Sequence, residues 1–122
     1  MILGWHLLFD AQGAAPSELA CEQRLRGALA ELPRALGLTP VGAPQVAKRP
    51  ALLVGLQLLA ESHLSLHLRP EAGMVHADLF SCAPFDRERA TALLLAAYPV
   101  TRHHVTWLER TLPGPERQPE DV

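Results

Sequence analysis

One segment of the 122-residue chain alternates strictly between polar side chains and leucine, and it reads His63-Leu64-Ser65-Leu66-His67-Leu68-Arg69. Successive side chains of a β-strand point to opposite faces of its sheet, so a period of two predicts a strand. The leucines share one face, and His63, Ser65, His67 and Arg69 share the other. The chain is therefore expected to form a sheet with one face in a core and one polar face.

Five further segments carry strand signals of different strength. Residues 51–60 are nearly all apolar and are expected to form a central strand or a buried strand-like run, whereas 38–47 contains prolines and a glycine and is expected to be irregular or an edge strand. The remaining three are 2–10, 74–80 and 102–110.

Two segments carry apolar residues at the three-and-four spacing of an amphipathic helix. Ser17 is expected to cap the first, which is disturbed at Pro33 and ends near Gly37; its apolar face is Leu25, Ala28, Leu29, Leu32 and Leu36. Asp86 is expected to cap the second, whose apolar face is Ala90, Leu93, Leu94 and Ala97.

This order of elements, with strands adjacent in sequence between two helices, predicts an α+β fold. We expect a two-layer sandwich in which an antiparallel sheet carries two helices on one face. Hydrophobic residues make up 48% of the chain, enough for a core. Residues 1–112 are expected to form a single domain, and the polar, proline-rich 113–122 a disordered tail.

Composition excludes several classes of partner. The net charge is −2, and no long basic block is present to bind nucleic acid. The longest apolar stretch, 51–60, is shorter than the roughly 18–20 residues that a membrane helix needs. The first residues lack the features of a secretory signal, so a cytosolic location is expected. Two cysteines are too few for a disulfide framework or a structural zinc site.

Nucleophilic and proton-transfer groups are concentrated within twenty-two residues, which contain Glu61, Ser62, His63, His67 and Cys82. Hydroxyls and imidazoles on a strand face are most often only solvated. The alternative is a catalytic site, because a nucleophile and its proton acceptors are both present.

Residues 59–67, 69–71 and 78–82 resemble the core of the prokaryotic S-adenosylmethionine decarboxylase proenzymes, and residues 4–10 with Gly13 resemble the family's opening motif. The resemblance implies a precursor that cuts itself between Glu61 and Ser62. Ser62 would become a pyruvoyl group, which forms a Schiff base with the substrate amine and withdraws electrons as carbon dioxide leaves. The product would enter spermidine synthesis.

The resemblance also implies roles for individual residues. His67 would act in processing and Cys82 would return a proton to the substrate carbanion, while Glu71 and Arg69 would bind the substrate. His67 is five residues from Ser62, on the opposite parity of an ideal strand, so we expect a bend or bulge near Ser62. The implied assembly is a homodimer with active sites at the interface. No metal is expected, and Cys21, placed within a helix, is expected to be inert.

The chain departs from the family pattern at three places. Lys48, Arg49 and Pro50 align with a phenylalanine-serine-proline stretch, Val54 replaces a hydroxyl before Gly55, and Arg69 replaces a tryptophan. The arginine guanidinium can still stack on adenine.

These departures leave alternatives open. The substrate could be ornithine or arginine, or the chain could be an unprocessed, non-catalytic partner of an active paralogue. A third alternative is a metal site formed by His63, His67 and His76. His6, His103 and His104 are expected to be ordinary strand residues.

Overall fold

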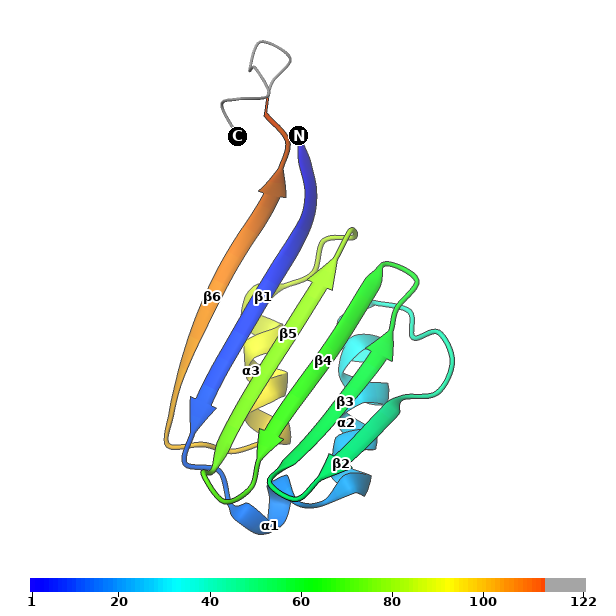
Figure 1. Ribbon diagram of the computed structural model, residues 1–122. Helices are drawn as coiled ribbons and strands as arrows, with labels where there is room; N and C mark the ends of the chain where they lie inside the picture. The colour runs from blue at the N-terminus through cyan, green and yellow to red at the C-terminus, as the bar shows by residue number, and fades with distance from the viewer. Residues whose placement is uncertain (114–122) are drawn as a thin grey trace.

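The computed structural model describes residues 1–113. In chain order the elements are β1 (Ile2–Gln12), α1 (Pro16–Leu19), α2 (Glu22–Ala35), β2 (Gln45–Arg49), β3 (Leu52–Leu58), β4 (Ser62–Arg69), β5 (Met74–Ser81), α3 (Arg87–Ala97) and β6 (Arg102–Thr111). The six strands form one antiparallel sheet in the order β2-β3-β4-β5-β1-β6, and α2 and α3 lie on one of its faces (Figure 1). The predicted two-layer α+β sandwich is confirmed.

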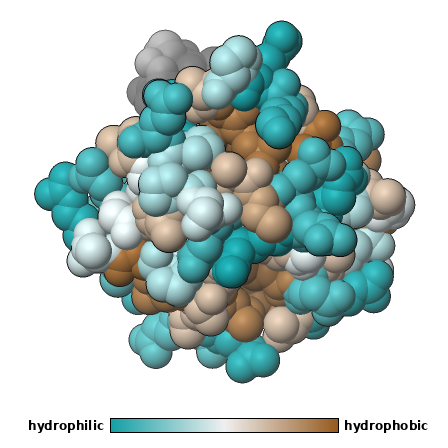
Figure 2. Space-filling view, turned by 90° about the horizontal axis from the view of Figure 1, so that it is seen from below, coloured by the Kyte–Doolittle hydropathy of each residue, from teal (hydrophilic) through white to brown (hydrophobic). Residues whose placement is uncertain are grey.

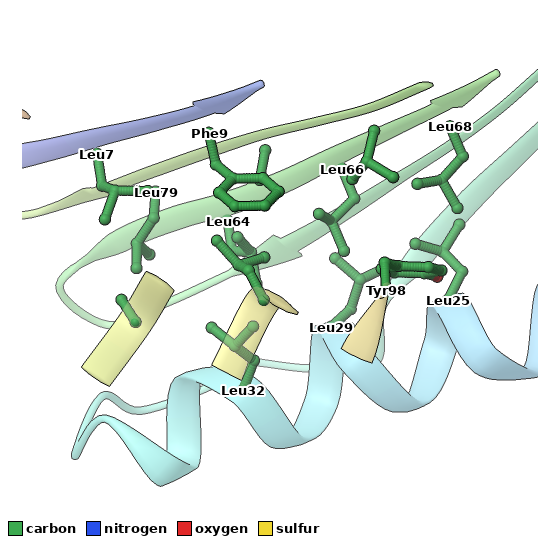
Figure 3. Close-up of a cluster of buried hydrophobic side chains, with 14 of the residues drawn as sticks. Leu7, Phe9, Leu25, Leu29, Leu32, Leu64, Leu66, Leu68, Leu79 and Tyr98 are labelled. Carbon is green, nitrogen blue, oxygen red and sulfur yellow. The ribbon is translucent and has the colours of Figure 1, made fainter. Parts of the chain in front are cut away.

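The core lies between the sheet and the helices, where leucines of β4 pack over α2 (Figure 3). Leu64, Leu66 and Leu68 are fully buried, as their alternation predicts. Leu25 and Leu29 of α2 are also fully buried. Each buried leucine stabilises the fold by about 1.5–3 kcal/mol relative to an exposed one. This burial fixes the other face of β4, with its histidines, as the open face of the sheet.

The first helical region differs from the prediction. Ser17 lies inside the short helix α1 and does not cap α2, because Pro16 at the start of α1 favours an earlier helical turn. Cys21 is the N-terminal cap of α2 and is not inside a helix; its Sγ accepts a hydrogen bond from the backbone N–H of Arg24 at 3.4 Å. The cap predicted at Asp86 is confirmed, since its carboxylate accepts from Glu88 and Arg89.

The structure refines two strand predictions. Only the end of 38–47 is a strand, since β2 begins at Gln45, after Pro40 and Pro44. Proline lacks a backbone N–H, so these residues suit the irregular approach to an edge strand. β2 is an edge strand of the sheet, as expected, and β3 lies inside the sheet, second from this edge and paired on both sides.

Side chains of neighbouring strands form rows across the open face, because the strand registers are continuous there. One row is Leu58, His63, Phe80, His6 and Leu108; the next is Leu56, Ser65, Asp78, Leu8 and Thr106; the third is Val54, His67, His76, Asp10 and His104. The first row lies nearest the start of β4. Histidine and aspartate side chains from four strands are therefore brought together on one surface.

The two ends of the sandwich carry different residues. Ser62 begins β4 at one end, while α1 and the β4–β5 turn lie at the other (Figure 1). The end with α1 is covered mostly by hydrophilic residues, with hydrophobic residues showing in separate patches (Figure 2).

No helix within residues 1–113 is long and apolar enough to cross a membrane.

Candidate active site

The peptide bond between Glu61 and Ser62 lies in the turn that joins β3 to β4. Two backbone hydrogen bonds close this turn: Leu59 N–H donates to the Ser62 carbonyl at 2.8 Å, and Ser62 N–H donates to the Leu59 carbonyl at 3.1 Å. Only Ala60 and Glu61 lie between these two residues. The amide nitrogen of the expected cleavage bond is therefore held in a fixed position at the end of the sheet.

The carbonyl group of the same bond is also held. Its oxygen, on Glu61, accepts a hydrogen bond from the backbone N–H of Cys82 at 3.0 Å. A donor at this oxygen stabilises the negative charge that develops when a nucleophile attacks the carbonyl carbon. The chain thus brings Cys82, twenty-one residues from Glu61, directly against the cleavage bond.

Thr39 holds the Glu61 carboxylate. One carboxylate oxygen accepts from the Thr39 backbone N–H at 3.0 Å and the other from its hydroxyl at 3.1 Å. The hydrogen bond from the backbone N–H of Thr39 is the main reason that the pKa of Glu61 lies below its ordinary value. The Thr39 carbonyl in turn accepts from Ala60 N–H at 2.8 Å, so residues on both sides of the turn are linked.

The nearest proton acceptor to the Ser62 hydroxyl is the neighbouring His63. Ser62 Oγ lies 3.4 Å from His63 Nδ1, and both side chains are partly buried. Ser81, which pairs with Ser62 across the strands, has its own hydroxyl bonded to Ala83 at 2.7 and 3.0 Å. The Ser81 hydroxyl is therefore engaged elsewhere.

His67 is not brought to Ser62. The register of β4 with β5 is unbroken from Ser62 to Arg69, so no bulge lies in this strand. The chain bends at Ala60 and Glu61, just before Ser62, but this bend does not bring His67 to Ser62 within one chain. Five residues of strand span about 16 Å, at about 3.3 Å per residue. His67 lies on the open face, opposite Val54 on β3 and His76 on β5.

Arg69 and Glu71 are farther still from Ser62. Arg69 ends β4, seven residues or about 23 Å along the strand, and Glu71 lies in the turn beyond it. Glu71 lines a cavity of about 160 Å³ together with Lys48, Arg49 and Pro50. Within one chain, the residues expected to bind the substrate and the residues expected at the cleavage site thus lie at opposite ends of the sheet.

Two histidines of the open face form close pairs with carboxylates. His6 Nε2 lies 2.6 Å from Asp78 Oδ1, and His76 Nδ1 lies 2.8 Å from Asp10 Oδ1. Among residues 1–113, no three His, Cys, Asp or Glu side chains are arranged to hold a metal ion. The arrangement lends no support to the metal alternative.

Three residues lie at the cleavage end whose part in the site was not predicted from the sequence. Thr39 comes from an irregular segment, and Asp78 and His6 come from other strands. Their contacts depend on strand register, which the alternation of β4 alone does not set. The period of two in residues 74–80 could have placed Asp78 on the polar face, but not beside a particular histidine.

Comparisons with known proteins agree with this geometry. A sequence profile described as S-adenosylmethionine decarboxylase matches residues 5–111. The chain belongs to the S-adenosylmethionine decarboxylase family. An S-adenosylmethionine decarboxylase proenzyme of Archaeoglobus fulgidus is 33% identical over 108 residues, 86% of this chain and 96% of the relative. Another, of Parasynechococcus marenigrum, is 30% identical over 114 residues, 93% of this chain and 89% of the relative.

A solved structure of this family has the same fold. The crystal structure of the adenosylmethionine decarboxylase from Aquifex aeolicus matches with a TM-score of 0.80 at 26% identity, covering 96% of this chain and 98% of the solved one. Membership of the S-adenosylmethionine decarboxylase family confirms the predicted enzyme class, a pyruvoyl-dependent carboxy-lyase. The relatives lend no support to the ornithine, arginine or non-catalytic alternatives.

Proposed function

We propose that this chain is a proenzyme that cuts itself between Glu61 and Ser62, turns Ser62 into a pyruvoyl group and then decarboxylates S-adenosylmethionine for spermidine synthesis. The observation that carries the proposal is the hydrogen bond between the Glu61 carbonyl and Cys82 N–H, beside the Ser62 hydroxyl. The proposed nucleophile, the carbonyl that it would attack and a thiol-bearing residue therefore meet at one peptide bond, which supports the proposal.

The residues at the bond between Glu61 and Ser62 suit the formation of a pyruvoyl group. The Ser62 hydroxyl supplies the nucleophile, and the Cys82 amide stabilises charge on the carbonyl under attack. Once formed, the pyruvoyl group supplies an electron-withdrawing carbonyl for the loss of carbon dioxide. The Cys82 thiol, exposed and next to the site, is proposed as the acid that reprotonates the substrate carbon.

A homodimer is the second part of the proposal, because a single chain separates the expected site residues. Ser62 and Cys82 lie at one end of the sheet, and Arg69, Glu71 and the cavity near Lys48 lie at the other. Two copies whose open faces meet in opposite directions would bring one chain's Ser62 to the other's His67, Arg69 and Glu71. Leu58 and Leu108, about half exposed on the open face, provide apolar area for such a contact.

The direct test of self-cleavage is intact mass. The purified protein is expected as two fragments, residues 1–61 and 62–122, the second beginning with a pyruvoyl group. Ser62→Ala removes the attacking oxygen with little change of volume, and the variant is expected to stay folded and uncut. A folded wild-type protein that keeps a single uncut mass would contradict the proposal.

The substrate is tested separately on the cleaved protein. Carboxyl-labelled S-adenosylmethionine is expected to release labelled carbon dioxide, whereas carboxyl-labelled ornithine and arginine are not. The cytosolic location stays a prediction of the sequence, to be checked by cell fractionation. Release from ornithine or arginine alone would show that the replacements at Lys48, Val54 and Arg69 accompany a change of substrate.

A further inference from the structure

We propose that His63 is the base that takes the proton from the Ser62 hydroxyl in the first step of self-cleavage, and that Asp78 and His6 position it. The inference rests on the proposed self-cleavage and assigns a residue to its first proton transfer. It arises because His67, the expected processing residue, lies about 16 Å along β4 from Ser62.

Three distances join these residues in a chain. Ser62 Oγ lies 3.4 Å from His63 Nδ1. On the other side of the imidazole ring, His63 Nε2 lies 3.7 Å from Asp78 Oδ1. The same oxygen of Asp78 lies 2.6 Å from His6 Nε2, a short hydrogen bond. Catalytic contacts are often long in a resting site, so 3.7 Å is compatible with a bond that closes as the imidazole becomes charged.

The positions of the ring nitrogens favour the tautomer that a base requires. A carboxylate only accepts hydrogen bonds, so a proton on His63 Nε2 is stabilised by Asp78. With Nε2 protonated, Nδ1 of the neutral ring carries a free electron pair, and this nitrogen is the one that lies against the Ser62 hydroxyl. A carboxylate, an imidazole and a hydroxyl in this order are the arrangement of a serine nucleophile with its oriented base.

The sheet explains why Asp78 stands between the two histidines. His63, Phe80 and His6 occupy one row across β4, β5 and β1, and Asp78 is two residues from Phe80 on the same face of β5. Both imidazole rings contact the Phe80 ring, with centroids 5.5 Å apart for His6 and 6.1 Å for His63. Their Nε2 atoms lie within 3.7 Å of the same carboxylate oxygen.

Within residues 1–113, Asp78 supplies the one carboxylate that lies within 4 Å of a His63 ring nitrogen. The neighbour of His63 on β3 is the apolar Leu58, and the β5 groups beside it are Phe80 and Asp78. Arg110 of β6 lies over the Phe80 ring at 5.0 Å. Asp78 is therefore the carboxylate that can compensate a positive charge formed on His63, with His6 holding it in place.

The proposed step is an acyl shift within the chain. His63 Nδ1 takes the hydroxyl proton as Ser62 Oγ bonds to the Glu61 carbonyl carbon, and the electron pair of the carbonyl moves to its oxygen, which Cys82 N–H stabilises. The carbonyl re-forms as the bond from that carbon to the Ser62 nitrogen breaks, and the nitrogen takes the proton from His63. The product is an ester between Glu61 and Ser62 with a free amine on Ser62, and no proton is gained or lost.

The experiment follows this ester in the full chain made by cell-free synthesis, because the precursor is then observed before it matures. Hydroxylamine cleaves an ester but leaves the peptide intact. The fragments of untreated samples report complete cleavage, and the additional fragments of samples quenched in hydroxylamine report the ester. His63→Ala is expected to slow ester formation by about 10²- to 10⁴-fold, as for loss of a positioned base, with partial rescue by added imidazole. His104→Ala, another exposed histidine of the open face, is the matched control and should react as wild type.

Asp78 is tested through conservative replacement. In Asp78→Asn no carboxylate compensates charge on the imidazole, so ester formation should be slower than in wild type. Asp78→Glu keeps a carboxylate and should restore part of the rate, whereas a purely structural role would leave both variants equally slow.

The possible outcomes separate the two proposals. A wild-type chain that forms neither ester nor fragments overturns self-cleavage and this inference with it. A wild-type chain that cuts while a folded His63→Ala chain forms the ester at a similar rate overturns only the role of His63. Equal rates of ester formation in folded Asp78→Asn and Asp78→Glu likewise overturn the positioning role. If His63→Ala fails to fold by circular dichroism, His63→Gln provides the same comparison with a polar, non-basic side chain.

Discussion

Cys82 contributes two groups of different kind to the site, and a substitution separates them. Its backbone N–H bonds the Glu61 carbonyl, whereas its thiol is proposed to donate a proton to the substrate. Cys82→Ala keeps the N–H, so the variant should still cut itself into two fragments. Its release of carbon dioxide from labelled S-adenosylmethionine should fall by about 10²- to 10⁴-fold. Full activity in this variant would rule out the thiol as the acid.

Thr39 is predicted to control the ionisation of Glu61, measured by NMR titration in the uncut Ser62→Ala chain. The pKa of Glu61 should lie below its ordinary value of 4.5, and Thr39→Val should raise it part-way, because the backbone N–H of residue 39 remains a donor. Thr39→Ser keeps the hydroxyl and should behave as Thr39. Equal titration curves for the valine and serine variants would contradict this assignment.

The lowered pKa of Glu61 also predicts how the stability of the fold changes with pH. A carboxyl whose pKa is lower in the folded than in the unfolded chain stabilises the fold above its unfolded pKa, and this stabilisation is lost as the pH falls through the folded pKa. The difference in unfolding free energy between Thr39→Val and Thr39→Ser should therefore be present at neutral pH and shrink below about pH 4. Urea denaturation at both pH values measures it.

At the level of single residues, sequence similarity located the chemistry but not all the contacts. Glu61, Ser62 and Cys82 were recognised from a motif, and the structure brings their backbones together. Thr39, Asp78 and His6 were missed because no local pattern states which strands become neighbours, and hydrogen bonds over long sequence separations depend on that order.

At the level of elements, the periodic patterns predicted most of the fold because burial enforces them. The leucines of β4 must face the helices, so its two faces follow directly from the period of two. The start of α2 was harder to predict, since Pro16 and Ser17 are good helix starters and form the separate helix α1. Cys21, a weak hydrogen-bond acceptor, is an unusual cap residue.

Close packing of α2 on β3 gives a prediction about two glycines. A Cβ atom at Gly55 would lie 2.4 Å from Leu29 Cδ1, whereas one at Gly27 of α2 would meet nothing within 4 Å. Gly55→Ala should destabilise the fold by about 1–3 kcal/mol through overpacking. Gly27→Ala should stabilise it by about 0.5–1 kcal/mol, because alanine is the better helix former. Urea denaturation of the uncut Ser62→Ala chain compares them, and equal effects would contradict this packing.

At the level of the whole molecule, the position of His67 is the strongest argument for an assembly. It shares the open face with the row of Asp10, His76 and Val54, remote from the turn that contains Ser62. If His67 acts in maturation after the ester has formed, a second chain must supply it. Maturation would then depend on association, and sedimentation should give about twice the 13.3 kDa mass of the chain.

A mixing experiment tests this dependence. Ser62→Ala cannot be cut but has an intact His67, and His67→Ala has an intact Ser62 but is expected to stop at the ester. Co-expression should produce pairs in which the His67→Ala chain is cut and the Ser62→Ala chain is not, as read from fragment masses. The double variant Ser62→Ala, His67→Ala is the control partner and should rescue nothing, because neither chain then supplies the imidazole. Complete cleavage of His67→Ala expressed alone would show that the chain matures without this residue, and the argument for a shared site would then rest only on Arg69 and Glu71.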